Sequence, residues 1–236
     1  LDEMILENIR EVRPHYFTSV PRLLEKLHDG ILQEAARQSS FRRKLIYWAI
    51  KLGKRYKGRK GMSLPYWFKS LFADLIIYRR WRKALGGRIE GIAVGAAALL
   101  PELVRLFSAA GIEIREGYGL TETSPVISFN RFEPGGVRFG TVGIPIPGVE
   151  VKIDEPNDEG EGEILAKGPN VMLGYYKNEE ETKAVIDEDG WFRTGDIGKF
   201  VHKRFLQITD RKKDIFKTSS GKFIAPQVIE NHLKSS

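Results

Sequence analysis

Cysteine is absent from the 236-residue sequence, which excludes disulfide bonds, a thiolate nucleophile and a cysteine-based zinc site. Histidine is scarce, and the four histidines are scattered rather than paired at metal-ligand spacing. No run approaches the roughly 18 apolar residues of a membrane-spanning helix. The first residues lack the basic and apolar parts of a signal peptide, and because the chain does not begin with Met, we do not expect Leu1 to be the natural N-terminus. These absences favour a reducing compartment, and we expect a cytoplasmic location.

Acidic residues are nearly missing from one segment, residues 37–88. This segment holds 16 lysines and arginines against the single acid Asp74, a local net charge of +15. The rest of the chain holds 22 bases and 30 acids, so the net charge of +7 comes from this segment alone. With 42% hydrophobic and 29% charged residues, the composition is ordinary for a soluble globular protein of one large domain or two small ones.

Two amphipathic stretches lie within the basic segment 37–88. The first places five apolar residues on one helical face: Phe41, Leu45, Trp48, Ala49 and Leu52. The second runs through Trp67, Phe68, Leu71, Phe72, Leu75 and Ile76. One interpretation is a helical pair packed on the core with a solvated basic face. The other is a peripheral surface for anionic lipid head groups, with Trp and Phe on its apolar side. Nucleic acid is not expected, because no Gly-aromatic RNA motif or zinc pattern accompanies the charge.

Residues 88–123 predict a strand, a helix and a second strand in that order. Arg88–Val94 predicts a buried strand, and the small residues 95–97 follow it. A helix that begins at Pro101 comes next, and the second strand leads into the polar turn 116–123. This order is that of a βαβ unit, and ligands of open α/β sheets bind at the carboxyl ends of strands. Both turns therefore occupy positions where a ligand is expected.

Glycine- and proline-rich turns separate short strands from residue 135 onward. This pattern predicts a small antiparallel β region over residues 137–208, with strands in Glu163–Lys167 and Lys199–Ile208. Residues 222–236 predict the beginning of an amphipathic helix.

The turn 116–123 has the sequence Glu-Gly-Tyr-Gly-Leu-Thr-Glu-Thr. Glycines let a backbone approach a ligand closely, and an aromatic face suits a purine. Hydroxyls suit phosphate oxygens, and a carboxylate suits a Mg²⁺ ion carried by a nucleotide. Taken alone, the motif fits a nucleotide site or a plain turn, and its place at a strand end favours the site.

Two later motifs make the chain resemble a known family. Residues 190–196 have the sequence Gly-Trp-Phe-Arg-Thr-Gly-Asp, and residues 208–217 have Ile-Thr-Asp-Arg-Lys-Lys-Asp-Ile-Phe-Lys. Alone, the first is typical of a hairpin turn and the second of a charged linker. In order after 116–123, they resemble the adenylate-forming superfamily of acyl-CoA synthetases, firefly luciferase and peptide-synthetase adenylation domains. Within it the chain most resembles the long-chain fatty acid–CoA ligases, through residues 16–27, 174–178 and 221–226 and the basic insert 37–88.

The resemblance implies a role for each residue of the first two turns. Gly95, Ala96 and Ala97 would border the adenine and acyl pocket. Tyr118 would pack on adenine beside Gly119. Thr121 would meet the phosphate, and Glu122 would hold Mg²⁺ and take part in catalysis with Thr121.

The later motifs are implied to bind the ribose and to move the small domain. Asp196 would bind the ribose hydroxyls, since a carboxylate can accept two hydrogen bonds, and Arg211 would bind the ribose as well. Lys213 stands at the hinge of the family's C-terminal domain, and Gly221 matches the edge of the pantetheine channel. Ser220 departs from the family's usual glycine at that position.

The implied reaction is a two-step ligation that uses ATP with Mg²⁺, a fatty acid and coenzyme A. The fatty acid carboxylate attacks the α-phosphate of ATP, which gives acyl-adenylate and pyrophosphate. The thiol of coenzyme A then displaces AMP to give acyl-CoA. The family's phosphate loop and its catalytic lysine have no counterpart in this sequence, so we expect the 236-residue chain to be inactive by itself.

The implied fold is α/β: part of the large adenylate-forming domain, built of βαβ layers with a small antiparallel β-barrel-like subdomain, and the start of the small α+β C-terminal domain. We expect divisions at 1–135 (with the basic insert 37–88), 136–210 and 211–236. A ligase for another carboxylic acid and a non-catalytic membrane-surface module are the alternatives. The protein could also lie peripherally on the inner face of the membrane, and it could form a homodimer; the sequence leaves both possibilities open.

Overall fold

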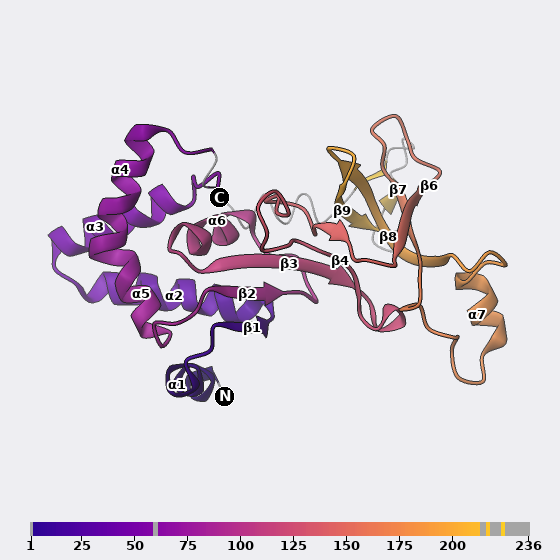
Figure 1. Cartoon of the computed structure of the whole chain (residues 1–236), viewed down its shortest axis with the longest axis horizontal. Coiled ribbons are helices and arrows are strands. Elements are labelled where there is room, and N and C mark those ends of the chain that lie inside the picture. The colour runs from indigo at the N-terminus through magenta and orange to yellow at the C-terminus, as the bar shows by residue number, and fades with distance from the viewer. Residues whose placement is uncertain (1, 59–60, 213–215, 218–222, 225–236) are drawn as a thin grey trace. The chain divides into compact units, whose positions relative to one another are not determined.

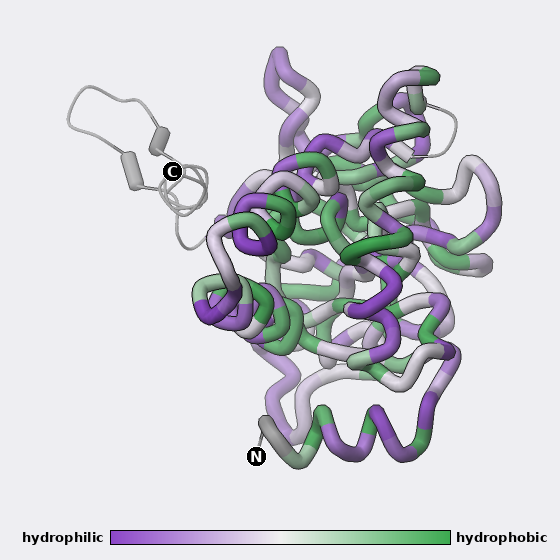
Figure 2. The backbone as a smooth tube through the Cα atoms, turned by 90° about the vertical axis from the view of Figure 1, so that its left-hand side faces the viewer, coloured by the Kyte–Doolittle hydropathy of each residue, from purple (hydrophilic) through white to green (hydrophobic). Residues whose placement is uncertain are grey.

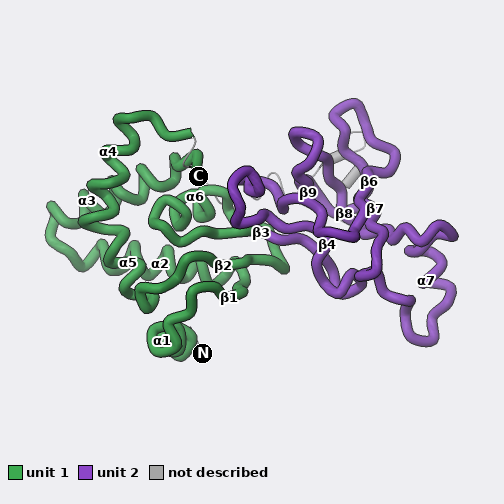
Figure 3. Tube along the Cα trace, viewed as in Figure 1, with its two compact units in different colours: residues 1–115 green, residues 116–236 purple. Residues whose placement is uncertain are grey.

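The structure is a computed structural model that describes residues 2–58, 61–212, 216–217 and 223–224. The chain divides into two compact units, Leu1–Arg115 and Glu116–Ser236 (Figure 3), and each is described by itself. The predicted divisions at residues 135 and 210 stay predictions.

Unit 1 begins with a short strand between two helices. Helix α1 (Asp2–Val12) precedes strand β1 (Tyr16–Ser19) and helix α2 (Pro21–Arg37), where proline occupies the first helical turn. Strand β2 (Gly91–Val94) pairs in parallel with β1, and helix α6 (Pro101–Ala109) follows it. Hydrophobic and hydrophilic residues alternate along α1, the helix beside the label N (Figure 2), as is typical of an amphipathic helix.

The basic insert 37–88 is helical in unit 1. It contains α3 (Ser40–Gly53), α4 (Leu64–Ala73), a π-helical turn η2 (Asp74–Tyr78) and α5 (Arg79–Ala84). They gather at one end of the unit (Figure 1).

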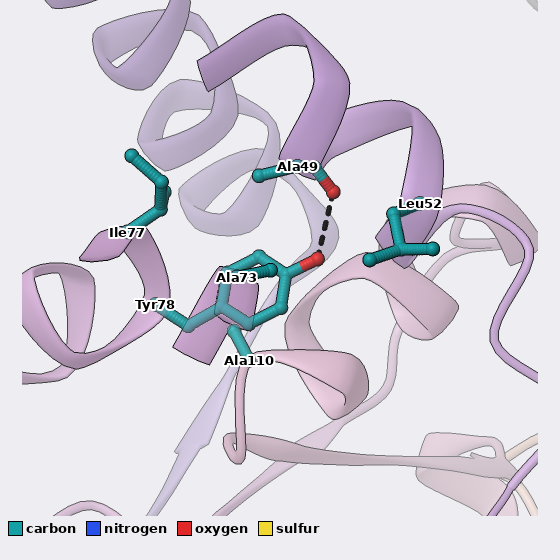
Figure 4. Close-up of a cluster of buried hydrophobic side chains, with 6 residues drawn as sticks. All are labelled: Ala49, Leu52, Ala73, Ile77, Tyr78 and Ala110. Atoms are coloured by element: carbon teal, nitrogen blue, oxygen red, sulfur yellow. Dashed lines mark hydrogen bonds between the residues drawn. The ribbon is translucent and has the colours of Figure 1, made fainter. Parts of the chain in front are cut away.

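Tyr78 anchors the insert. Its hydroxyl donates to the Ala49 carbonyl at 2.7 Å from within a cluster of small and aliphatic side chains (Figure 4). Burial raises the pKa of Tyr78 well above its usual range, so the phenol remains a donor. Arg82 binds Asp74, the only acid of the insert, through two nitrogen–oxygen contacts of 2.5 and 3.1 Å.

Strand β3 (Glu113–Gly119) leads from unit 1 into unit 2, and the sheet follows the order β1-β2-β3-β4-β5. In unit 2, β3 pairs antiparallel with β4 (Val126–Phe129), which pairs with β5 (Ile144–Pro145). Between β3 and β4 lies the short 3₁₀ turn η3 (Thr121–Thr123).

A second sheet of unit 2 is antiparallel, in the order β6-β7-β8-β9. Its strands are Glu150–Asp154, Gly162–Lys167, Phe192–Val201 and Phe205–Arg211, and helix α7 (Glu179–Val185) precedes β8. A two-stranded ladder joins β10 (Phe216–Lys217) and β11 (Phe223–Ile224). Among the described residues the four-stranded sheet is open, so the barrel-like shape that we expected is not found there.

Two local expectations differ from the structure. Lys199–Ile208 is divided between β8 and β9, because His202 and Lys203 turn the chain with φ of 49° and 62°. Such turns usually carry Asn or Gly, and neither residue marks this one. Residues 190–196, typical of a hairpin turn when taken alone, complete such a turn only at their start, where Ile186 bridges Phe192, and the rest of the motif lies in β8. The helix predicted over 222–236 lies outside the described residues. No described helix is long and apolar enough to cross a membrane.

Candidate functional site

The motifs 116–123 and 190–196 meet in unit 2 through Tyr118 and Asp196. The Tyr118 hydroxyl donates to Asp196 Oδ2 at 2.7 Å, although 78 positions separate the two residues. Arg211, the cross-strand partner of Asp196, places its Nε 3.2 Å from Asp196 Oδ1. The Asp196 side chain is 7% exposed and that of Arg211 is 62% exposed. The structure therefore brings together three of the predicted residues, with a buried carboxylate beside an accessible guanidinium.

The surroundings keep Tyr118 protonated. Its ring lies among apolar side chains that include Ile127, Ile164 and Leu206. Burial, and then the charge of Asp196, raises the pKa of Tyr118 far above its usual range. The phenol thus donates to the carboxylate at neutral pH. Because Tyr118 is only 8% exposed, little of its ring surface faces solvent, and its predicted contact with adenine stays a prediction.

Glycine at position 119 is required by a close backbone approach. A Cβ at this position would lie 1.6 Å from the Pro125 carbonyl oxygen, far inside any real contact. The ladder between β3 and β4 shifts its register between Tyr118 and Gly119, which lets the following turn fold back over the strand. Gly119 therefore shapes the turn through its own backbone.

The two threonines of the turn have different surroundings. Thr123 is fully buried; its Oγ1 accepts from the Leu120 amide at 3.0 Å and donates to the Pro125 carbonyl at 2.7 Å. Thr121 is exposed, and its hydroxyl has no partner within the described part of the chain. Thr123 thus fixes the turn, while the Thr121 hydroxyl is available to a ligand.

Glu122 is held by a residue outside its own motif. Its Oε1 accepts from the Tyr175 hydroxyl at 3.0 Å, and its backbone carbonyl accepts from the Met172 amide at 2.8 Å. Burial and the hydrogen bond to Glu122 raise the pKa of Tyr175, so this phenol also stays a donor. Within the described ranges, no three histidine or acidic side chains gather as a metal site. A Mg²⁺ ion delivered by a nucleotide needs only one or two protein carboxylates, and Glu122 fits that limited part.

The remaining predicted residues belong to unit 1 or fall outside the described residues. Gly95, Ala96 and Ala97 directly follow β2 in unit 1, and Ala96 has a φ of 71°. Ala96 and Ala97 are exposed. Lys213 and Gly221 lie outside the described residues, so the hinge and pantetheine roles stay predictions.

Asn170 is a positioning residue that sequence reasoning missed. Its Nδ2 donates to the carbonyls of Thr123 and Val126 at 3.0 and 2.8 Å. It therefore joins the segment before β8 to the turn that carries Thr121 and Glu122. An isolated asparagine in a loop gives no sequence signal for such a contact.

Thr194 supports the buried carboxylate from the same strand. Its Oγ1 donates to the Ile164 carbonyl at 2.8 Å and accepts from the Asp196 amide at 3.1 Å. The Thr-Gly-Asp portion of the motif 190–196 thus joins β8 to β7 and orients Asp196.

Comparison with known proteins identifies the family of the chain. The family described as AMP-binding enzyme matches residues 1–176. The chain belongs to this family. Long chain acyl-CoA synthetase 6, a peroxisomal protein of Arabidopsis thaliana, is 37% identical over 96% of this chain and 33% of its own length. Long-chain-fatty-acid–CoA ligase 1 of Homo sapiens is 36% identical over 97% of the chain and 32% of its own length. The chain thus spans about one third of the length of these relatives.

Solved structures share the fold. ATP-bound MatB from Rhodopseudomonas palustris matches all of this chain with a TM-score of 0.68 and 27% identity, over 38% of its own chain. MenE from Bacillus subtilis, in complex with ATP and magnesium, matches with a TM-score of 0.66 and 24% identity, over 39% of its own chain. The predicted α/β class and the resemblance to adenylate-forming enzymes are confirmed.

Proposed function

We propose that this chain supplies the nucleotide-binding part of a long-chain fatty acid–CoA ligase. The observation that carries the proposal is the buried Asp196 carboxylate held between Tyr118 and Arg211. It occurs in a member of the AMP-binding family that is 36–37% identical to long-chain acyl-CoA synthetases.

Asp196 is suited to bind the ribose of the nucleotide. A carboxylate has about four lone-pair sites, so Asp196 can accept from ribose hydroxyls in addition to its contacts within the protein. Because Tyr118 and Arg211 hold the carboxylate in place, binding a ribose needs little further ordering of Asp196. Arg211 is paired with Asp196 and is largely exposed. Its guanidinium therefore adds positive charge near the nucleotide.

Thr121 and Glu122 are suited to the phosphates and their metal ion. The exposed hydroxyl of Thr121 can donate to a phosphate oxygen. Glu122 can offer one carboxylate oxygen to Mg²⁺ while Tyr175 donates to the other. When bound, Mg²⁺ supplies neutralisation of the phosphate charge.

The proposed reaction asks for positioning more than for proton transfer. A fatty acid carboxylate is already ionised at pH 7, and its oxygen forms a bond to the α-phosphorus as pyrophosphate leaves. The sulfur of coenzyme A then bonds to the acyl carbon, AMP leaves, and the thiol proton is lost. The protein must bring anions together and stabilise the growing charge, which oriented donors achieve.

The test is ATP–pyrophosphate exchange by the full-length protein with acids of graded chain length, palmitate among them. We expect Asp196→Asn to raise the KM for ATP at least tenfold, because hydrogen bonds to a charged group contribute about 1.5–3 kcal/mol each. Asp189→Asn makes the same chemical change on an exposed turn and should leave the KM unchanged.

Exchange that is unaffected by Asp196→Asn would contradict the site. Exchange with short or aryl acids but not with palmitate would contradict the substrate class and leave the site intact. We further propose that the 236-residue chain alone does not turn over, and measurable exchange by the purified chain would refute that. A cytoplasmic location and a homodimer stay predictions.

A further inference from the structure

The basic insert presents an apolar stripe to solvent. Six large side chains of α4 and η2 recur at intervals of three and one, which places them on one helical face. Each is between 45 and 76% exposed: Leu64, Trp67, Phe68, Leu71, Phe72 and Leu75. The sequence allowed a helix packed on the core through this face, and the structure turns the face outward.

The opposite face of the same helix holds it in place. Ala73 and Ile77 are buried, and the Tyr66 hydroxyl donates to the Leu52 carbonyl of α3 at 3.0 Å. Trp48 of α3 also contacts Phe72 edge to face, with ring centroids 6.0 Å apart. The apolar stripe is therefore a fixed surface of a packed helix. Contiguous exposed apolar patches of this kind are uncommon on soluble proteins and mark interaction sites.

A basic rim accompanies the apolar stripe on the helices of the same insert. Its members are all exposed: Arg42, Arg43 and Lys44 on α3, Lys69 on α4, and Arg79, Arg80 and Lys83 on α5. The one acid of the insert, Asp74, is already bound to Arg82. None of the rim residues forms a salt bridge within the described part of the chain, so their charge is available to an anionic partner.

The combination favours a lipid surface over other anionic partners. Leucines and edge-to-face aromatics, such as Trp67 and Phe68 with centroids 4.9 Å apart, can enter the acyl boundary of a bilayer. Nucleic acid would use the charge but would leave the leucines exposed to water. An acidic protein would need its own apolar groove to cover the stripe. A helix that is apolar on one face and flanked by Lys and Arg is typical of segments that lie in the membrane interface.

We propose that α4 and η2 dock on the surface of a membrane that contains anionic lipids. The apolar stripe enters the interface, and the basic rim contacts the lipid phosphates. The helix lies in the plane of the interface, in keeping with the finding that no described helix is able to cross a bilayer. This goes beyond the proposed ligase activity and does not depend on it, because the test below uses neither ATP nor coenzyme A.

The test is flotation of the full-length protein with vesicles of phosphatidylcholine alone or with phosphatidylglycerol added. We expect strong binding only to the anionic vesicles. The apolar variant carries Trp67→Ser, Phe68→Ser and Leu71→Ser, and should lose at least tenfold in affinity. The charge variant carries Arg42→Gln, Arg43→Gln and Lys44→Gln. One charge near an anionic surface is worth about fivefold, so we expect at least a tenfold loss and weaker binding at high salt.

Two matched controls make the same chemical changes in unit 2. Leu173→Ser with Tyr176→Ser removes two side chains that are 103 and 87% exposed. Lys177→Gln, Lys183→Gln and Lys203→Gln neutralises three exposed lysines. Both controls should bind anionic vesicles as the parent does. Circular dichroism checks that every variant is folded, which the exposure of the changed side chains favours.

Several results would overturn the proposal. One is a parent protein that does not bind anionic vesicles. Another is a loss of vesicle affinity in the controls as large as that in the variants. RNA binding that survives the apolar variant, without vesicle binding, would assign the basic rim to nucleic acid. A dimer in sedimentation velocity that the apolar variant dissociates, again without vesicle binding, would assign the stripe to contact between copies of the protein.

Discussion

The hydrogen bond from Tyr118 to Asp196 allows a direct test of how the candidate site is built. Tyr118→Phe removes one hydroxyl and keeps the ring among its apolar neighbours. Asp196 Oδ2 then loses a donor at 2.7 Å in a place that is nearly closed to water. Hydrogen bonds to charged groups contribute about 1.5–3 kcal/mol, and Arg211 still faces the other oxygen. We therefore expect the free energy of unfolding to fall by about 2 kcal/mol.

Urea unfolding, followed by tryptophan fluorescence, measures this loss directly. For a chain of this size we also expect the melting temperature to fall by about 5 °C. Tyr176→Phe is the matched control, because its ring is 87% exposed, and it should change stability by less than about 0.5 kcal/mol. A double-mutant cycle with Asp196→Asn should give a coupling of at least about 1 kcal/mol.

The pH dependence gives a second readout of the same bond. Burial raises the pKa of Tyr118 in the folded state, so its contribution to stability is present below the unfolded pKa near 10 and is lost as pH rises above it. Tyr118→Phe should therefore make the alkaline loss of stability shallower. A stability change no larger than that of Tyr176→Phe, or an unchanged alkaline limb, would refute the reasoning.

Three further substitutions test other parts of unit 2. Gly119→Ala should cost about 3 kcal/mol or more by urea unfolding, because the new Cβ meets the Pro125 carbonyl; Gly30→Ala, in open space on α2, should instead be neutral or stabilising. Asn170→Ala leaves two carbonyls without their donor, so we expect a loss of about 2 kcal/mol and faster hydrogen exchange in the turn 121–126, and unchanged exchange would refute this. Burial raises the pKa of Glu116 to about 8, so its contribution to stability is present below pH about 4.5 and is lost as pH rises to 8. Glu116→Gln should therefore stabilise the protein at pH 8 and not at pH 4, and an equal effect at both would contradict the shift.

The sequence allowed prediction of the elements whose signal is local. Pro21 and Pro101 mark the starts of α2 and α6, since proline fits the first helical turn. The small residues 95–97 follow β2, and the segment 116–123 forms the end of β3 and the turn after it, where ligands of α/β sheets are expected. The residue types of the turn predict a site for phosphate and Mg²⁺, and these roles stay predictions.

Features that depend on distant partners could not be predicted from residue patterns. Helical period places Phe68 and Leu71 on one face of α4, but it does not say whether that face meets the core or solvent. The contact of Tyr118 with Asp196 joins positions 78 apart; only the family resemblance suggested that they share a site. Asn170 and Tyr175 were missed because their role consists of reaching another loop.

The described residues of the site divide into two sets by their hydrogen bonds. Thr123 and Asn170 donate to backbone carbonyls of the turn, and Tyr118 donates to a buried carboxylate. Thr121 and Arg211 are exposed, and the first has a free hydroxyl. A buried group that loses its hydrogen-bond partner costs free energy, whereas an exposed group can bind water instead. Changes in the first set should therefore lower the free energy of unfolding, and any loss of ligand affinity should follow from that loss of stability. A change at Thr121, which has no such buried partner, should lower ligand affinity while the free energy of unfolding stays the same, so measuring both quantities separates support from binding.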